Sequence, residues 1–161
     1  MDALALLKKQ HREAERLFKR VKEAEGLDKE RAFLQLADEL STHASIEEKV
    51  FYPSVMSDPA EEDLRQATQE HLEVKRTLAD LLDLEANDTR FDERMKILEE
   101  QVRHHVSEEE NELFKKVARE FGRDVLEKLG SEMERLATLL RESDLDEMHP
   151  AVEEESRLGP H

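Results

Sequence analysis

Hydrophobic residues recur along most of the chain at the three- and four-residue spacing that places them on one face of an α-helix. Glycine and proline number only four each, and no run of β-branched residues alternates with polar ones as in a strand. The pattern therefore predicts an all-α protein. Five amphipathic helices are expected at about residues 2–25, 28–56, 59–86, 91–117 and 123–141.

Short turn signals separate the predicted helices. Gly26 follows the first helix, the Ser-Asp-Pro cluster at 57–59 follows the second, and the Asn-Asp pair at 87–88 follows the third. Short connections between long helices force neighbouring helices to run antiparallel. We expect an up-down-up-down antiparallel four-helix bundle in residues 1–121, a short accessory C-terminal helix packed on the bundle in residues 122–142, and an acidic, flexible tail in residues 143–161.

The chain is strongly acidic, with 41 Asp and Glu against 25 Lys and Arg and a formal net charge of -16. This charge repels phosphates and anionic lipid surfaces, so we expect neither nucleic acid nor a membrane as a partner. No apolar stretch is long enough to span a bilayer, and the N-terminus lacks the features of a secretory signal. These observations predict a soluble, cytoplasmic, single-domain protein that is a monomer or a weak dimer.

The candidate metal ligands are histidines and glutamates, because the chain contains no cysteine. Four predicted helices each carry one histidine in the hydrophobic stripe, and two of these histidines open an H-x-x-x-E step. Residues four apart on a helix are offset by about 40° and about 6 Å, so both side chains of a step can face one point. Six such ligands are too many for one tetrahedral zinc, but they fit two ions bridged by carboxylates with positions left open. The six predicted ligands are His11, His43, Glu47, His71, His105 and Glu109.

The four histidines are expected to lie at one level of the bundle. Each is about 13 to 17 residues from the turn next to its helix, and residues equally far from a turn lie at equal height in an antiparallel hairpin. His71 follows His11 by 60 positions, and the second H-x-x-x-E step follows the first by 62. The two halves of the chain look like repeated helical hairpins, which predicts a near-symmetric two-metal centre.

A structural role for these residues is the main alternative, since a single histidine on an apolar stripe is more often a core residue than a ligand. Glu47 and Glu109, however, interrupt apolar stripes, where an unpaired buried carboxylate is costly. No Lys or Arg falls on these stripes at the same level, so a metal ion is the favoured source of compensating charge. Neighbouring groups are expected in lesser roles. Glu15 is an extra ligand or a solvated acid, and His104 is an interface group or a support for the ligands. Tyr52 is a core residue or lines the pocket, and Glu48 and Glu110 are surface charges.

The segments around the two H-x-x-x-E steps resemble a known family. HASIEEKVFYP at 43–53 and HHVSEEENELF at 104–114 are similar to the two signature segments of the hemerythrin-like, or HHE cation-binding, domain of bacterial and mycobacterial type. The resemblance covers about residues 1–120. It implies a non-haem di-iron centre inside a four-helix bundle, with two iron ions joined by an oxo or hydroxo bridge and by the two carboxylates. The residues that match the family's iron ligands are the same six histidines and glutamates.

The sequence departs from the oxygen-carrying members of this family at two positions. Those proteins have a second histidine four residues after the position of His71, where this chain has Lys75. They also have an aspartate five residues after the histidine that matches His105, whereas Glu109 follows it by four. The missing nitrogen ligand leaves one iron more open, which argues against reversible dioxygen storage. A ferritin-like site is excluded, since none of the four histidines closes an E-x-x-H step.

Three classes of function are open from the sequence. An open di-iron site binds dioxygen, peroxide or nitric oxide, so the first is a protein that binds or senses such small ligands. The second is a catalase-like enzyme that decomposes hydrogen peroxide, with Glu15 or Tyr52 moving protons. The third is an iron-handling protein or a purely structural bundle. Manganese or zinc would also fit these ligands, and the redox partner is not indicated by the sequence.

Overall fold

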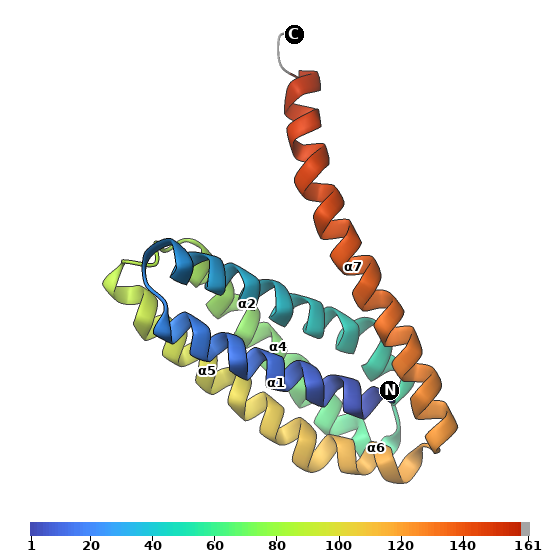
Figure 1. Ribbon diagram of the computed structural model, residues 1–161. Coiled ribbons are helices and arrows are strands. Elements are labelled where there is room, and N and C mark those ends of the chain that lie inside the picture. The colour runs from blue at the N-terminus through green and yellow to red at the C-terminus, as the bar shows by residue number, and fades with distance from the viewer. Residues whose placement is uncertain (159–161) are drawn as a thin grey trace.

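The computed structural model describes the backbone of residues 1–158 and the side chains of residues 1–143. Within this part of the chain every regular element is a helix, which confirms the predicted all-α class (Figure 1). The long helices are α1 (Ala3–Glu23), α2 (Gly26–Ile46), α4 (Glu61–Leu82), α5 (Thr89–Glu108) and α7 (Arg123–Leu158). The shorter elements are η1 (Glu47–Phe51), α3 (Tyr52–Ser54), η2 (Asp58–Ala60), η3 (Glu109–Leu113) and α6 (Phe114–Glu120).

Helices α1, α2, α4 and α5 lie side by side and form a bundle, while α7 crosses one end of it (Figure 1). Contacts between α1 and α2 show that these two helices run antiparallel. Arg20 Nη1 donates to Gln35 Oε1 at 3.0 Å toward one end of the pair, and His43 Nδ1 lies 2.6 Å from Gln10 Oε1 toward the other. Helices α4 and α5 are also antiparallel, through the pairs Gln66–Glu108 and Thr77–Gln101.

Local sequence explains where helices begin and where the first turn forms. Asp2 Oδ1 accepts a hydrogen bond from the Ala5 N–H at 2.8 Å, and Asp88 Oδ1 accepts one from the Arg90 N–H at 2.9 Å, as N-cap residues do. Gly26 has a φ of 59°, a left-handed conformation that glycine adopts without a Cβ clash. The chain therefore reverses in a short turn between α1 and α2, where the sequence predicted it.

The apolar interior is divided into two clusters by a level of buried polar residues. The cluster next to α7, which we call the α7-end core, includes Leu7, Ile46, Phe51, Leu64, Phe114 and Met133. The opposite cluster, which we call the Gly26-end core, includes Leu17, Phe33, Leu36, Leu81, Phe91 and Leu98. On α1, His11 lies between Leu7 of the first cluster and Leu17 of the second. Helices α2 and α4 also contribute to both cores, and α5 reaches the α7-end core through its continuation η3.

Helix α7 closes the end of the bundle. Leu126, Leu129 and Met133 are buried in the α7-end core. Gly130 lies so close to the start of the chain that an added Cβ would overlap backbone atoms of Met1. The absence of a side chain at this position therefore lets α7 pack directly on the N-terminal end of α1.

The backbone of α7 continues beyond the end predicted near residue 142 and reaches Leu158. A helix of this length places its C-terminal part away from the bundle (Figure 1). The flexible tail predicted for residues 143–161 concerns a segment whose side chains lie almost entirely outside the described residues. That part of the domain division stays a prediction.

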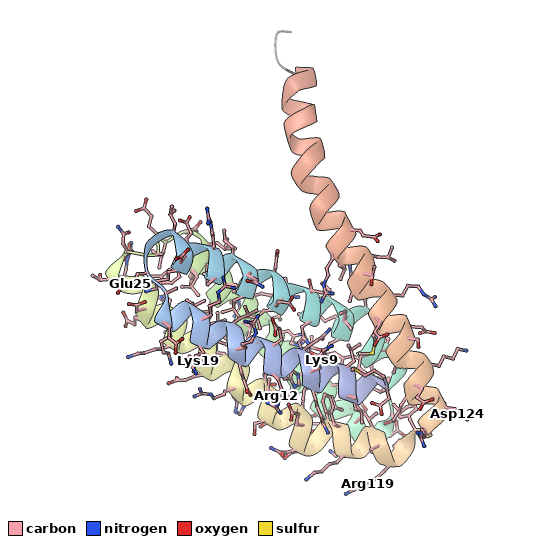
Figure 2. All side chains as sticks on the ribbon, viewed as in Figure 1. Lys9, Arg12, Lys19, Glu25, Arg119 and Asp124 are labelled. Atoms are coloured by element: carbon pink, nitrogen blue, oxygen red, sulfur yellow. The ribbon has the colours of Figure 1, made fainter. Side chains whose placement is uncertain are left out.

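Charged side chains cover the outside of the bundle. Figure 2 shows Lys19, Glu25 and Arg119 extending outward from the ribbon. Among the described residues, no helix combines the length and the apolar character that crossing a membrane requires.

Candidate metal centre

The six predicted ligands all lie in the polar level between the two apolar cores. They come from α1, from α2 and its continuation η1, from α4, and from α5 and its continuation η3. Five of the six are buried, with Glu47 at 0% and Glu109 at 2% exposure, and His43 is partly buried. The structure therefore brings together every residue that the sequence singled out as a ligand.

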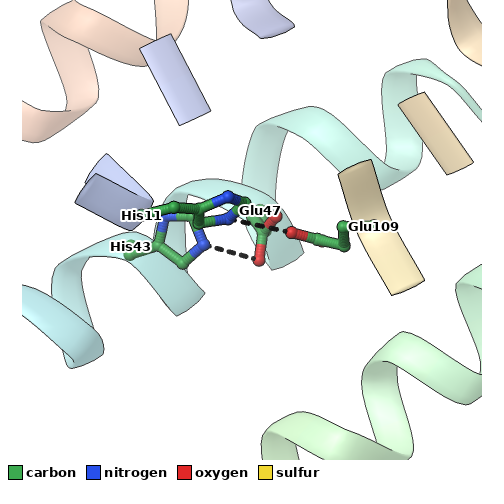
Figure 3. A group of neighbouring side chains, drawn as sticks. All are labelled: His11, His43, Glu47 and Glu109. Atoms are coloured by element: carbon green, nitrogen blue, oxygen red, sulfur yellow. Dashed lines mark ion pairs between the residues drawn. The ribbon is translucent and has the colours of Figure 1, made fainter. Parts of the chain in front are cut away.

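Two groups of four side chains occupy this level, each compact enough to hold one metal ion. Within each group, one ligand atom from every residue lies within 4.8 Å of the others. Group A consists of His11, His43, Glu47 and Glu109 (Figure 3), and group B consists of Glu47, His71, His105 and Glu109. Both glutamates belong to both groups. This geometry suits a pair of metal ions bridged by two carboxylates.

The atoms of group A that face its centre lack other partners. His11 Nε2 lies 3.2 Å from Glu109 Oε1, and His43 Nε2 lies 3.1 Å from Glu47 Oε1 (Figure 3). Both Nε2 atoms, Glu109 Oε1 and the second Glu47 oxygen, Oε2, are buried and make no hydrogen bond. A buried polar atom left without a partner costs about 1–3 kcal/mol, and a cation at the centre of the group would remove that cost. The donor set therefore fits a metal ion.

The ligand atoms of group B also face a common point. His71 Nε2 and His105 Nε2 lie 3.2 Å apart, and they are 2.9 and 3.4 Å from Glu47 Oε1. His105 Nε2 is also 3.4 Å from Glu109 Oε2. Two imidazole nitrogens that face each other across a carboxylate oxygen are an arrangement that a shared cation stabilises.

The outer nitrogen of three site histidines is held by an oxygen acceptor. His11 Nδ1 lies 2.7 Å from Glu110 Oε2, and His43 Nδ1 lies 2.6 Å from Gln10 Oε1. His105 Nδ1 lies 2.9 Å from the buried carboxylate of Glu70, whereas His71 Nδ1 is 3.8 Å from Glu48 and makes no hydrogen bond. An imidazole that donates through Nδ1 keeps the lone pair of Nε2 directed at the centre, as in metal-binding histidines.

The sequence interpretation missed these outer partners. The surface role predicted for Glu110 is wrong, since its side chain is only 17% exposed and holds His11 while pairing with Arg12 at 2.7 Å. The repeat of the two halves of the chain contained a signal that could have identified these partners. Glu70 follows Gln10 by 60 positions and Glu110 follows Glu48 by 62, the same offsets that relate the predicted ligands. The residues beside the outer histidine nitrogens therefore repeat together with the histidines, and three of these four residues accept a hydrogen bond.

Tyr52 belongs to the site and Glu15 does not. The buried Tyr52 hydroxyl donates to Glu109 Oε2, lies 3.1 Å from Glu47 Oε1 and is 3.3 Å from His71 Nε2. Burial, together with the charges of the two glutamates, raises the pKa of the Tyr52 phenol well above its usual value. The Tyr52 hydroxyl therefore stays protonated and acts as a hydrogen-bond donor to the glutamates. Glu15 lies at the surface and pairs with Arg12 at 2.6 Å.

Both shared glutamates stand at the start of a π-helical turn. In η1 the Tyr52 N–H donates to the Glu47 carbonyl, and in η3 the Phe114 N–H donates to the Glu109 carbonyl. In a regular α-helix a residue five positions on points about 140° away. The wider π turn brings the two residues of each pair closer to one face, which directs Tyr52 toward Glu47. Turns of this kind are frequent at functional sites, and helical periodicity alone does not indicate them.

Burial and neighbouring charges act in opposite directions on the pKa values of the polar level. Burial by itself raises the pKa of the Glu47 carboxyl, but the charge of His43 and hydrogen bonds, including one with Glu109, outweigh it and hold the pKa well below its usual range. Burial likewise opposes protonation of His105, yet the nearby carboxylates, Glu109 foremost, raise its pKa well above the usual value. The pKa of His11 is raised for the same reasons. The buried histidines and glutamates thus shift one another's pKa values toward their charged forms.

A small cavity opens onto the edges of the four site histidines. Its volume is about 140 Å³, and most of its other lining is apolar. The apolar lining residues include Ala14, Leu40, Val74, Leu78 and Val102. A broader groove of about 460 Å³ between α1 and α5 shares His11, Val102 and Val106 with the cavity wall. A molecule of a few atoms could therefore enter through the groove and occupy the cavity next to groups A and B.

Comparisons with known proteins agree with this geometry. The profile of the family described as "Hemerythrin HHE cation binding domain" matches residues 2–117. A "DNA nickase" from Nostoc sp. (strain PCC 7120 / SAG 25.82 / UTEX 2576) is 30% identical over 115 residues, which are 71% of this chain and 33% of that protein, so the chain spans about a third of the length of this curated relative. The crystal structure of a hemerythrin HHE cation-binding domain-containing protein from Mycobacterium kansasii has the same fold, with a TM-score of 0.83, 24% identity and 92% coverage of both chains.

Proposed function

The chain belongs to the hemerythrin HHE cation-binding domain family, and on this premise we propose that it binds two iron ions, one in group A and one in group B, and with them a small ligand such as dioxygen, peroxide or nitric oxide. The main support is that Glu47 and Glu109 belong to both groups. Each ion would have two imidazole nitrogens and two bridging carboxylates as protein ligands. The antiparallel pairs α1–α2 and α4–α5 support an up-down-up-down four-helix bundle as the scaffold.

The donor set is compatible with iron, and the resemblance to hemerythrin-like proteins is the reason for proposing iron over manganese or zinc. Two histidines with carboxylates and open positions are typical of non-haem iron sites that react with oxygen. Iron bound there supplies the electron transfer, because it cycles between the ferrous and ferric states. The protein keeps the rings of His11, His43 and His105 in place through their outer acceptors, which also makes those rings better donors.

The cavity and Tyr52 lie on different sides of the polar level. The cavity is lined by residues of the Gly26-end core and admits a small ligand while its apolar walls limit water. Tyr52 packs in the α7-end core and does not line the cavity. It holds a proton at its hydroxyl within hydrogen-bond distance of both glutamates. We infer that Tyr52 is a positioning residue that acts on the centre through Glu47 and Glu109.

Decomposition of hydrogen peroxide is the second candidate function. Two molecules of peroxide would yield two of water and one of dioxygen, so no further reductant is needed. Oxygen-carrying members of the family have a histidine where this chain has Lys75, and Lys75 pairs with Glu48 at 2.9 Å outside the centre. Group B therefore lacks a third histidine, and the open position on its ion supports reaction with peroxide over oxygen storage. An iron-storage role has less support, since the cavity at the site measures only about 140 Å³. We propose no action on DNA, because the net charge of -16 opposes contact with phosphates.

Metal analysis followed by ligand assays tests the proposed function. Untagged protein expressed with iron is expected to contain about two irons per chain. Rapid release of dioxygen from hydrogen peroxide, lost in His43→Ala, would establish the peroxide-decomposing enzyme. A stable and reversible oxygen complex would instead establish a binding protein. Iron content near zero after anaerobic ferrous reconstitution of well-folded protein would contradict both and leave a structural bundle.

The conservative variant Tyr52→Phe is expected to retain both irons but to slow peroxide turnover about 10- to 100-fold, the usual cost of losing a group that supports metal ligands. The phenol donates to the shared carboxylates without being needed as a ligand. Iron per chain, turnover and the visible spectrum of the oxidised protein would be measured together. Unchanged turnover and spectrum would show that the Tyr52 hydroxyl only fills space in the α7-end core.

A further inference from the structure

A third group of metal-binding side chains lies on the outside of α4 and α5. It consists of Glu70, His104 and Glu108, each with one ligand atom within 4.8 Å of the others. His104 and Glu108 form another H-x-x-x-E step, displaced by one residue from His105 and Glu109. His104 Nε2 lies 3.1 Å from Glu70 Oε2 and 3.6 Å from Glu108 Oε1. The His104 side chain is 62% exposed, so the group is open to solvent.

Glu70 links this surface group to the buried centre. The residue is only 8% exposed, and its Oε1 is 2.9 Å from His105 Nδ1. Its other oxygen, Oε2, is buried, makes no hydrogen bond and faces His104. A buried carboxylate oxygen without a hydrogen bond, directed at an exposed His–Glu step, is suited to a cation.

A small gap lies where two residues of the surface group, Glu70 and Glu108, come near the shared glutamate Glu109. It measures about 10 Å³ and is lined by Glu70, Glu108 and Glu109 together with Asp63, Ala67 and Leu113. The gap lies beside the π turn η3, which begins at Glu109. Four of its six lining residues are acidic; Asp63 pairs with Lys116 at 2.6 Å, and the carboxylates of Glu70, Glu108 and Glu109 are the others. Glu47 and Glu109 are almost fully enclosed, and this gap reaches Glu109 from the side opposite the cavity that touches the four histidines.

We propose that Glu70, His104 and Glu108 form a third, weaker divalent-cation site, and that ferrous ion is taken up there before it passes along Glu70 and Glu109 to groups A and B. The uptake role rests on the proposed function, whereas the surface site does not. One nitrogen and two carboxylates give fewer donors than the buried groups, and the exposed position keeps the ion hydrated. Both properties favour weak binding and ready release.

The surface site is tested by calorimetric titration with Zn²⁺. The wild-type protein is expected to bind one more ion per chain than His104→Ala, whatever groups A and B already hold. Glu108→Gln should behave like His104→Ala, and Glu112→Gln, which removes an exposed acid one turn away, should behave like the wild type. His104 is exposed, so these variants are expected to fold. Equal numbers and affinities of sites in wild type and His104→Ala would overturn the proposed site.

The uptake role is tested by the rate of iron loading. Metal-free protein is mixed with ferrous ion under anaerobic conditions, and protein-bound iron is measured after rapid removal of free ion with a chelator. His104→Ala is expected to reach the same final iron content as the wild type, but about tenfold or more slowly. Equal loading rates would overturn the uptake role and leave the Zn²⁺ result standing. Failure of the wild type to take up iron at all would instead contradict the proposed function. The assay therefore distinguishes failure of the uptake role from failure of the proposed function.

Discussion

Replacing Glu47 or Glu109 is expected to abolish binding of both iron ions, whereas replacing one histidine should remove mainly one. Each glutamate belongs to group A and to group B, so its loss takes a ligand from both ions. His11 belongs only to group A and His71 only to group B. Iron per chain in Glu47→Gln and Glu109→Gln should fall from about two to near zero, and His11→Ala and His71→Ala should retain about one. Elemental analysis on purified, iron-loaded protein measures these contents.

A matched control separates loss of a ligand from loss of the fold. Glu13→Gln changes a partly exposed acid on α1 that pairs with Arg16 at 2.6 Å, two residues from His11, and should keep full iron content. The glutamine variants preserve side-chain volume and remove a buried negative charge, so their helical circular dichroism is expected to stay at the wild-type level. Retention of both irons in a folded Glu47→Gln variant would exclude Glu47 as a shared ligand. An equal loss in all four ligand variants would argue against two distinct groups.

Metal loading is expected to raise the free energy of unfolding by several kcal/mol and to reverse its dependence on pH. If free ferrous ion exceeds each dissociation constant about 1,000-fold, each ion contributes about 4.1 kcal/mol, or about 8 kcal/mol for two. Loaded protein should gain stability as the pH rises from about 5 to about 8, because protons compete with metal for histidine and carboxylate ligands. Denaturant unfolding with ferrous ion or with a chelator measures both effects.

The metal-free protein should show the opposite trend above neutral pH. The raised pKa values of His11 and His105 add stability that is fully present below the ordinary histidine value of 6.5 and is lost as the pH rises through the raised values. The lowered pKa of Glu47 adds stability that is present above 4.5 and is lost as the pH falls through the lowered value. Metal-free stability is therefore expected to be greatest between about pH 4.5 and 6.5. The same pH trend with and without metal would show that these residues do not form the metal site.

The helices and the six candidate ligands follow from the sequence because both depend on local spacing. Hydrophobic periodicity, the N-caps at Asp2 and Asp88 and the turn at Gly26 are short-range signals. Once the turns are known, helical rise sets the height of each residue, so histidines at similar distances from their turns meet at one level. Glu47 and Glu109 could be assigned to the same level because each lies one helical turn from a histidine.

The surroundings of these ligands depend on contacts that no local pattern specifies. Glu110 was expected at the surface, but the approach of α1 to η3 places it against His11. The wider turns at Glu47 and Glu109 belong to the closely packed polar level, and they direct Tyr52 toward the glutamates although helical spacing points it elsewhere. The surface group of Glu70, His104 and Glu108 likewise exists only because α4 lies against α5. The sequence by itself therefore determined which side chains can bind metal, since helical geometry repeats every turn. Only the tertiary structure decided what holds those side chains, because hydrogen bonds between helices depend on how the helices pack.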